Sequence, residues 1–390
     1  MSGKNDEAGD LPLTAAECRR TLRNSKRLVV KVGTSTLTHP SGKLNLERLE
    51  RVVRELADQV NAGRQVILVT SGAVGAGMGR LGLKEKPRTL PEKQAAAAVG
   101  QGILMHMYEK LFAEYGIIVA QILLTRDDLA DRRRYLNARH TLGTLLRLGV
   151  LPIINENDTV AVEEIRVGDN DTLSALVAGL VDADVLILLT DSEGLYTSNP
   201  QTCPEAKLIH VVEEITPEIE SLAGGSSSTW STGGMVTKIQ AARLATSFGI
   251  PVVIASGFLP GQVAAILRGE EVGTLFLPRE HRAQARKRWL AYGPSVQGKI
   301  IVDAGAARAL IHSGKSLLPS GIVSVEGEFD QGSLVSIIGP GGQEIARGMA
   351  NYSAEEIRRI QGKKTSEILA VLGYKDYDEV VHRDNLIILV

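Results

Sequence analysis

Short apolar runs that alternate with helical periods constrain the fold of this chain more than any other feature. The runs are rich in β-branched residues and lack the polar alternation of a half-exposed strand. They are RLVVKV (27–32), QVILVT (65–70), IIVAQILLT (117–125), LPIIN (151–155), DVLILLT (184–190) and IPVVIAS (250–256). Strands that are apolar throughout belong to a parallel sheet covered by helices on both faces. We therefore predict an α/β fold, an open and mainly parallel sheet sandwiched by helices, over residues 27–277.

The flanking segments have a different composition. Residues 1–26 are polar at their start and are expected to form a poorly ordered extension with one short helix. Residues 278–297 are charged and then rich in turn formers, which indicates a linker. We predict a second, small and mostly β domain at 298–377, because short strands there are separated by glycine-rich turns. Residues 378–390 are expected to be a tail.

Composition excludes several classes of protein. The 390 residues are 44% hydrophobic, with 44 basic and 45 acidic side chains, so there is no global charge that would attract nucleic acid or an anionic membrane. Cys18 and Cys203 lie far apart, which predicts neither a disulfide framework nor a zinc site. The N-terminus lacks the pattern of a signal peptide. A cytoplasmic protein is the expectation.

Ligands of an open α/β sheet bind beyond the carboxyl ends of its strands. The segments at or near those ends are KVGTS (31–35), TSGAVGAG (70–77), NEND (155–158), GDND (168–171), TDSEGLY (190–196) and, at a helix start, STGGMVTK (231–238). Glycines at such positions let backbone N–H groups face an anion, so phosphate is the expected ligand, although ordinary loop chemistry accounts for any single turn. Ala309 and Arg80 replace glycines that a P-loop and a dinucleotide fingerprint would need.

Two lysines stand out in these segments. Lys31 ends an otherwise apolar run, where a buried ammonium would need a partner. Either it reaches water from an edge position, or it faces a phosphate beside Gly33. Lys238 follows Gly233 and Gly234 within two turns of a helix start, where it is either solvated or shares an anion with the helix N-terminus.

Six carboxylates lie close together between residues 154 and 181. They are Glu156, Asp158, Glu163, Glu164, Asp169 and Asp171. Metal ligation, helix capping and the floor of a substrate pocket are all compatible with this spacing.

Taken in order, VVKVGTS, VTSGAVGAG, INENDTV, VGDNDTLSA, LLTDSEGLYT and TGGMVTKIQAA resemble the amino acid kinase family, and within it the members that phosphorylate glutamate. Residues 298 to about 377 resemble a PUA domain. The resemblance covers nearly the whole chain from Arg27 onward. It implies ATP-dependent transfer of a phosphoryl group to the γ-carboxylate of glutamate, the first step of proline biosynthesis.

The resemblance also implies roles for particular residues. Lys31 and Lys238 would flank the transferred phosphoryl group, and Asp171 would orient both. Glutamate would be held by Ser71, Asp158 and Asn170, with Asn155 and Asp169 nearby; Asp158 suits the α-ammonium and the amide N–H of Asn170 suits a carboxylate. The expected ATP-binding residues are Lys31, Gly33, Thr190, Asp191, Tyr196, Thr232, Gly233, Gly234, Met235, Val236, Thr237 and Lys238.

Cofactors, partners and alternatives follow from the same resemblance. Magnesium is expected to arrive with ATP, bound by phosphate oxygens and water, and we assign no metal ligand in the protein. Proline is expected to inhibit, through a region that includes residues 135–142, and residues 223–234 suggest a flap or a plain loop. We expect a homo-oligomer, a dimer or a tetramer. The alternatives are a kinase for acetylglutamate, aspartate, carbamate or a nucleotide.

RNA binding by the PUA-like domain is the alternative from another class of function. Residues 298–390 hold 10 basic and 12 acidic side chains. This net charge of −2 disfavours a nucleic-acid partner.

Overall fold

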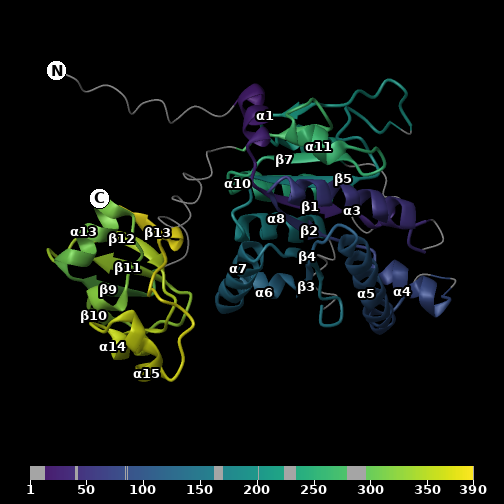
Figure 1. Ribbon diagram of the computed structural model, residues 1–390. Coiled ribbons are helices and arrows are strands. Elements are labelled where there is room, and N and C mark those ends of the chain that lie inside the picture. The colour runs from purple at the N-terminus through teal and green to yellow at the C-terminus, as the bar shows by residue number, and fades with distance from the viewer. Residues whose placement is uncertain are drawn as a thin grey trace, which may run out of the picture. The chain divides into compact units, whose positions relative to one another are not determined.

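The computed structural model describes residues 14–39, 43–83, 85, 87–161, 170–200, 202–223, 234–278 and 296–389. The chain divides into two compact units, each with a sheet of its own (Figure 1). The first consists of Met1–Ala130 and Asn137–Arg282, and the second of Asp131–Leu136 and Ala283–Val390.

The first unit contains an eight-stranded sheet in the order β3-β4-β2-β1-β5-β7-β8-β6. Its strands are β1 (Arg27–Val32), β2 (Gln65–Val69), β3 (Val119–Leu124), β4 (Leu151–Glu156), β5 (Val185–Thr190), β6 (Val211–Val212), β7 (Val252–Ser256) and β8 (Thr274–Phe276). All neighbours pair in parallel except β7 and β8. The predicted mainly parallel α/β fold is confirmed.

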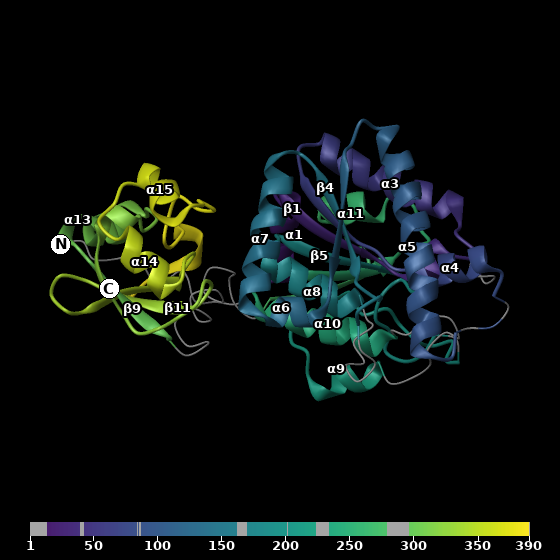
Figure 2. The same ribbon diagram turned by 90° about the horizontal axis from the view of Figure 1, so that it is seen from below.

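Helices cover both faces of this sheet. They are α1 (Ala15–Arg23), α2 (Thr34–Leu37), α3 (Leu46–Asn61), α4 (Ala73–Leu81), α5 (Leu90–Ala113), α6 (Arg126–Ala130), α7 (Arg132–Arg147), α8 (Asn170–Leu180), α9 (Pro217–Leu222), α10 (Met235–Ser247) and α11 (Gln262–Leu267). In Figure 2 the strands β1 and β5 lie between α3 on one side and α8 and α10 on the other. Leu28, Val30 and Val32 point to the first side, where they join a core with Leu56 of α3 and Tyr108 of α5.

Glycines allow α4 and α5 to pack at unusually short range. A Cβ atom on Gly77 would lie 1.7 Å from the carbonyl oxygen of Ala96, and one on Gly100 would lie 1.7 Å from that of Ala73. No real Cβ atom fits at such a distance, so both positions require glycine. The turn TSGAVGAG therefore differs from the expected phosphate-binding turn, because Gly77 serves helix packing.

The N-terminal extension is more ordered than expected from Thr14 onward. A capping box formed by Thr14 and Glu17 begins α1. Cys18 and Leu22 are fully or almost fully buried in the core of the first unit. The prediction of one short helix is confirmed, whereas loose order is wrong for residues 14–26 because this helix has an apolar face to bury.

The second unit has a five-stranded sheet in the order β10-β9-β11-β12-β13. Its strands are β9 (Gly298–Val302), β10 (Ile322–Glu326), β11 (Leu334–Ile338), β12 (Glu344–Met349) and β13 (Leu386–Ile388), and its helices are α13 (Ala304–Ser313), α14 (Ala354–Ile360) and α15 (Ile368–Leu372), with short 3-10 turns at Pro319–Gly321, Thr365–Glu367 and Arg383–Asn385. The pair β9 and β11 is parallel and the others are antiparallel. The predicted small, mostly β domain is confirmed.

The predicted C-terminal tail belongs to this second fold. Val380 and Val381 are fully buried in its core, and β13 pairs with β12. The alternation of apolar residues in this short segment is too brief to predict a strand from sequence, and pairing with β12 stabilises it.

No helix among the described residues is long and apolar enough to cross a membrane.

Candidate active site

The strand order places a ligand site at the end of β1. From β1 the chain continues to β2, β3 and β4 on one side of the sheet and then crosses to β5 and β7 on the other. Such a reversal leaves a crevice beyond the carboxyl ends of the two central strands, where open α/β proteins bind ligands. Gly33 and the N-terminus of α2 follow β1 at this point.

Strand alternation decides where Lys31 points. Its neighbours Val30 and Val32 face the core with α3 and α5, so Lys31 faces the opposite side, toward α8 and α10. Only 5% of the residue is exposed, which excludes the interpretation as a solvated edge lysine. A buried ammonium requires a charged partner.

Asp171 supplies that partner and binds a second lysine as well. Its Oδ1 forms an ion pair with Lys31, and its Oδ2 accepts a hydrogen bond of 3.2 Å from Lys238 Nζ. Asp171 is fully buried and Lys238 is 7% exposed. Asp171 lies in the first turn of α8 and Lys238 in the first turn of α10. The tertiary fold therefore brings together the three residues predicted as catalytic.

The two lysines control the ionisation of this aspartate. Burial alone would raise the pKa of the Asp171 carboxyl, but the charges of and hydrogen bonds from Lys31 and Lys238 outweigh burial and hold that pKa well below its usual value. Asp171 is ionised at every physiological pH. Two ammonium groups and one carboxylate leave an excess positive charge in a buried site, which favours binding of an anion.

Helix α10 adds backbone donors beside this charge. Its N-cap is Gly234, which offers no side chain to satisfy the first N–H groups. The N–H groups of Met235 and Val236, together with the helix dipole, are thus available to an anion. The Thr237 hydroxyl lies 3.0 Å from Asp171 Oδ2 and 2.8 Å from the carbonyl oxygen of Gly234.

Gly33 differs from its predicted role as a phosphate donor. Its N–H group already donates to the carbonyl oxygen of Leu189 at 3.3 Å. Thr34 and Ser35, in the first turn of α2, carry the N–H groups for which the helix provides no acceptor. A Cβ atom on Gly33 would lie 3.7 Å from Lys31 Nζ, an ordinary contact distance, so Gly33 adjoins the ammonium group.

A chain of hydrogen-bonded amide side chains lies toward β2 and β4, the neighbours of β1 on the side away from β5. Asn170 Nδ2 donates to Ser71 Oγ and to Asn155 Oδ1, at 3.0 Å in both cases. Asn155 Oδ1 also accepts from the backbone N–H of Glu156 at 2.9 Å, and Asn155 Nδ2 donates to Gln101 Oε1 at 2.8 Å. The predicted substrate residues Ser71, Asn155 and Asn170 are therefore in contact with one another.

The geometry alters the predicted role of Asn170. Both hydrogen bonds from its Nδ2 go to the protein, and within the part of the chain that the structure describes its buried Oδ1 has no hydrogen-bond partner. The group left for a ligand is an acceptor, which suits an ammonium and not the carboxylate expected from the sequence. Asp158, after β4, has a pKa raised by burial to about 6. No described hydrogen bond or ion pair involves its carboxylate, which leaves it free for a cationic ligand.

The predicted nucleotide residues are less closely connected. Thr190, at the end of β5, donates to Asp191 Oδ1 at 3.0 Å, and its side chain is on the same face as Lys31 by strand alternation. Tyr196 forms a bridge with Leu208, and no described contact joins it to the lysine–aspartate cluster. Predictions for Asp169, Thr232 and Gly233, and for Glu163, Glu164 and most of the 223–234 flap, lie outside the described residues.

Sequence reasoning missed Gln101. It lies within the alanine-rich helix α5, and its side chain reaches Asn155 across 54 positions of sequence. The available signal was a polar residue in the run AAAAVGQG. Because a solvated helical glutamine produces the same pattern, only the packing of α5 could identify it.

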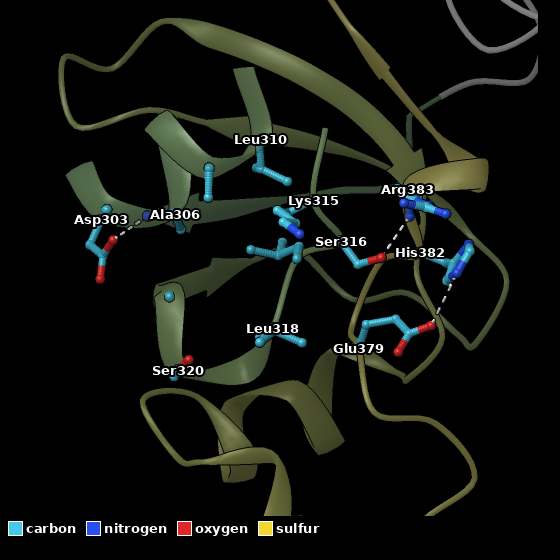
Figure 3. Close-up of a pocket in the computed structure, with 14 residues that line it drawn as sticks. Asp303, Ala306, Leu310, Lys315, Ser316, Leu318, Ser320, Glu379, His382 and Arg383 are labelled. Carbon is cyan, nitrogen blue, oxygen red and sulfur yellow. Dashed lines mark hydrogen bonds and ion pairs between the residues drawn. The ribbon is translucent and has the colours of Figure 1, made fainter. Parts of the chain in front are cut away.

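The second unit contains a separate pocket of about 610 Å³ (Figure 3). Leu310 and Leu317 form apolar parts of its wall, and its lining also includes the charged or titratable side chains of Asp303, Lys315, Glu379, His382 and Arg383. In Figure 3, Asp303 lies at the opposite end of the pocket from Glu379, His382 and Arg383. Glu379 pairs with His382 at 3.6 Å. Acidic and basic side chains are balanced here, so the lining does not define one class of ligand.

The site combines two lysines on one aspartate with a helix N-terminus that has no side-chain cap and with a cluster of amides, all at one edge of a covered, mainly parallel sheet. These features define a class of protein: a phosphotransferase that brings two anionic substrates together. Comparison with known proteins agrees. Residues 26–256 match the amino acid kinase family and residues 298–372 match the PUA domain. The chain belongs to the amino acid kinase family, and both predicted resemblances are confirmed.

Its relatives define the branch of the family. A glutamate 5-kinase from Moorella thermoacetica is 75% identical over 377 residues, which cover 97% of this chain and 100% of the relative. A glutamate 5-kinase from Caldanaerobacter subterraneus subsp. tengcongensis is 57% identical over 363 residues, covering 93% of this chain and 98% of the relative. Among solved structures, a UMP kinase from Bacillus anthracis covers 65% of this chain and 97% of its own, with 19% identity and a TM-score of 0.46.

Proposed function

We propose that this protein is a glutamate 5-kinase. It transfers the γ-phosphoryl group of ATP to the side-chain carboxylate of glutamate and thereby performs the first step of proline biosynthesis. The observation that carries this proposal is the buried cluster of Lys31, Asp171 and Lys238, whose excess positive charge lies between a helix N-terminus and an amide cluster. The high identity to glutamate 5-kinases over nearly the whole chain supports the choice of substrate.

The reaction needs positioning and charge more than covalent chemistry. A γ-carboxylate oxygen of glutamate attacks the γ-phosphorus of ATP, the bond to the β,γ-bridging oxygen breaks, and ADP leaves with that electron pair. Lys31 and Lys238 stabilise the negative charge on the moving phosphoryl group. Asp171 keeps both ammonium groups in place and limits their mutual repulsion.

The two substrates occupy different sides of this cluster. The ATP phosphates lie at the N-terminus of α10, near Gly234, Met235, Val236 and Thr237, with Thr190, Asp191 and Tyr196 on the nucleotide side and Thr232 and Gly233 added from the sequence. Glutamate lies at Ser71, Asn155 and Asn170, with Asp169 added from the sequence. Asp158 and Asn170 Oδ1, both acceptors, receive its α-ammonium.

Magnesium enters with ATP in this proposal. No group of three or more His, Cys, Asp or Glu side chains that could hold a metal ion occurs among the described residues. We propose that phosphate oxygens and water supply most of its ligands, and that the ion neutralises charge on the nucleotide.

An initial-rate assay with ATP tests the proposed function. Acyl phosphate formation, trapped as the hydroxamate with hydroxylamine, should require glutamate and should be weak with acetylglutamate, aspartate, carbamate or a nucleoside monophosphate. ATP hydrolysis that does not depend on glutamate, or faster turnover of another acceptor, would contradict the proposal.

Inhibition by proline and homo-oligomer formation are further parts of the proposal. Proline, like glutamate, carries an ammonium and a carboxylate, and the segment 135–142 in α7 is the expected regulatory region. Rates that stay constant through a saturating proline titration would remove proline inhibition and leave the kinase reaction untouched.

A further inference from the structure

Gln101 contacts the proposed glutamate site through Asn155. The Nδ2 group of Asn155 donates to Gln101 Oε1 at 2.8 Å, within a partly buried part of the first unit. Asn155 itself is 2% exposed. None of the roles given to the substrate residues from the sequence includes this glutamine.

One backbone N–H group fixes the orientation of the three side-chain amides of Gln101, Asn155 and Asn170. The N–H of Glu156 donates to Asn155 Oδ1 at 2.9 Å, and a backbone N–H cannot accept. Asn155 must therefore donate from Nδ2 to Gln101, and Gln101 must accept with Oε1. By the same argument, Asn170 must direct Nδ2 toward Asn155 Oδ1. The Oδ1 atom of Asn170 then takes no part in this hydrogen bond.

This arrangement leaves one polar atom unsatisfied at each end of the row of three amides. Asn170 Oδ1 and Gln101 Nε2 are both buried, and neither has a hydrogen-bond partner among the described residues. A buried unsatisfied polar group destabilises the folded state, and such groups are concentrated where a site is prepared for a ligand. The amide cluster is held in an orientation that serves binding and not its own stability.

We propose that Gln101 is a positioning residue for the amino acid substrate, an inference that rests on the proposed function. Its Oε1 holds the Asn155 amide, which holds the Asn170 amide, so that Asn170 Oδ1 is presented as an acceptor for an ammonium group. Gln101 thereby favours substrates with a free α-amino group, without contributing to the ATP side of the site.

Two substitutions at one position separate the hydrogen bond from the packing. Gln101→Met keeps the length of the side chain and removes the acceptor, whereas Gln101→Glu keeps an acceptor oxygen whether or not it is protonated. We expect Gln101→Met to raise the KM for glutamate about 10- to 100-fold, because the Asn155 amide loses its partner. The KM for ATP should change less than about twofold, and Gln101→Glu should recover most of the glutamate affinity.

A double-mutant cycle tests whether Gln101 acts through Asn155. The Gln101→Met and Asn155→Ala double variant should have the same glutamate KM as Asn155→Ala alone, because the two residues belong to one chain of hydrogen bonds. Gly102→Ala is the control for this turn of α5, since a Cβ atom there meets nothing within 4 Å. It should retain wild-type values for both substrates.

The outcomes distinguish this inference from the proposed function. If wild-type protein shows no glutamate-dependent phosphoryl transfer, the proposed function fails. If wild-type protein is active and Gln101→Met leaves the glutamate KM unchanged, or raises both KM values equally, the positioning role alone is overturned. Additive losses in the double variant, or equal losses in Gln101→Met and Gln101→Glu, would also overturn it.

Discussion

At the scale of single residues, Asp171 contributes the negative charge of the candidate active site. It is fully buried and lies between the ammonium groups of Lys31 and Lys238. Removing one member of a buried charge cluster leaves the remaining charges uncompensated, which typically costs about 3–5 kcal/mol of stability. Residues in this cluster therefore affect both the fold and the reaction, and a test of catalysis must separate the two.

Lysine substitutions achieve that separation. Lys238→Met leaves the neutral pair of Lys31 and Asp171 and should retain the fold, while kcat falls about 10²–10³-fold because one electrostatic donor to the phosphoryl group is lost. Asp171→Asn should lower both kcat and the melting temperature. Steady-state rates and thermal unfolding measure the two effects, with exposed Lys110→Met as the control. Wild-type turnover in Lys238→Met would contradict the assigned role.

Asp158 predicts a pH dependence of glutamate binding. Burial raises its pKa to about 6, and only the ionised carboxylate attracts the α-ammonium of glutamate. We expect kcat/KM for glutamate to fall as the pH decreases below about 6, with no such fall in kcat/KM for ATP at saturating glutamate. Asp158→Asn should lose this acidic limb together with most of the glutamate affinity. If kcat/KM for glutamate still falls at acidic pH in Asp158→Asn, the fall is caused by another titrating group.

The same pKa makes a prediction about stability. A carboxyl whose pKa is raised from 3.8 to about 6 on folding disfavours the folded state only where it is ionised, so the cost develops between about pH 4 and 6 and persists above pH 6. Asp158→Asn should therefore unfold at a higher temperature than wild type at pH 7, and this difference should vanish toward pH 4. A difference that is constant across this range would indicate a cause other than ionisation.

At the scale of elements, the contact between α4 and α5 positions the helix that carries Gln101, next to the proposed glutamate site. Both Gly77 and Gly100 lie where a Cβ atom would overlap a backbone carbonyl of the opposite helix. Because α5 also carries Gln101, a shift of this helix would move the amide chain. In the proposed function, helix packing and glutamate binding are thus linked through α5.

Alanine substitutions at two glycines test this link. Gly77→Ala must separate α4 from α5 and should destabilise the first unit by a few kcal/mol through overpacking, with a raised KM for glutamate. Gly102→Ala has open space around its Cβ atom and should be neutral or slightly stabilising, since alanine favours a helix interior. Chemical denaturation and KM measurements of both variants would show whether the effect depends on the contact.

At the scale of the whole molecule, each of the two units has a hydrophobic core of its own. All described residues that we assign to catalysis and substrate binding lie in the first unit. We expect calorimetry of the full chain to show two unfolding transitions, of which a non-hydrolysable ATP analogue raises only one. Gly77→Ala should lower that same transition. A single transition shifted by the analogue would show that the two units unfold cooperatively.

Much of the fold followed from local pattern. Runs such as Val66–Val69 and Val185–Leu189 are apolar throughout, and this composition is typical of strands in a covered parallel sheet. Three strands of the second unit, β10, β11 and β12, were equally visible between their glycine turns. The sequence did not predict that α1 is well ordered or that β13 forms a strand. Each element is too short to fold alone and depends on the core or the strand that it joins.

The sequence by itself determined the class of fold, the family and the identity of the charged residues at the strand ends, because these depend on local periodicity and on ordered motifs. Only the tertiary structure decided what those residues contact. Strand alternation turned Lys31 away from water and toward α8 and α10, where Asp171 meets it. The hydrogen bonds that join Gln101 of α5, Asn155 of β4 and Asn170 of α8 then fixed which atom of each amide is left for a ligand, because hydrogen-bond direction depends on neighbours far apart in sequence.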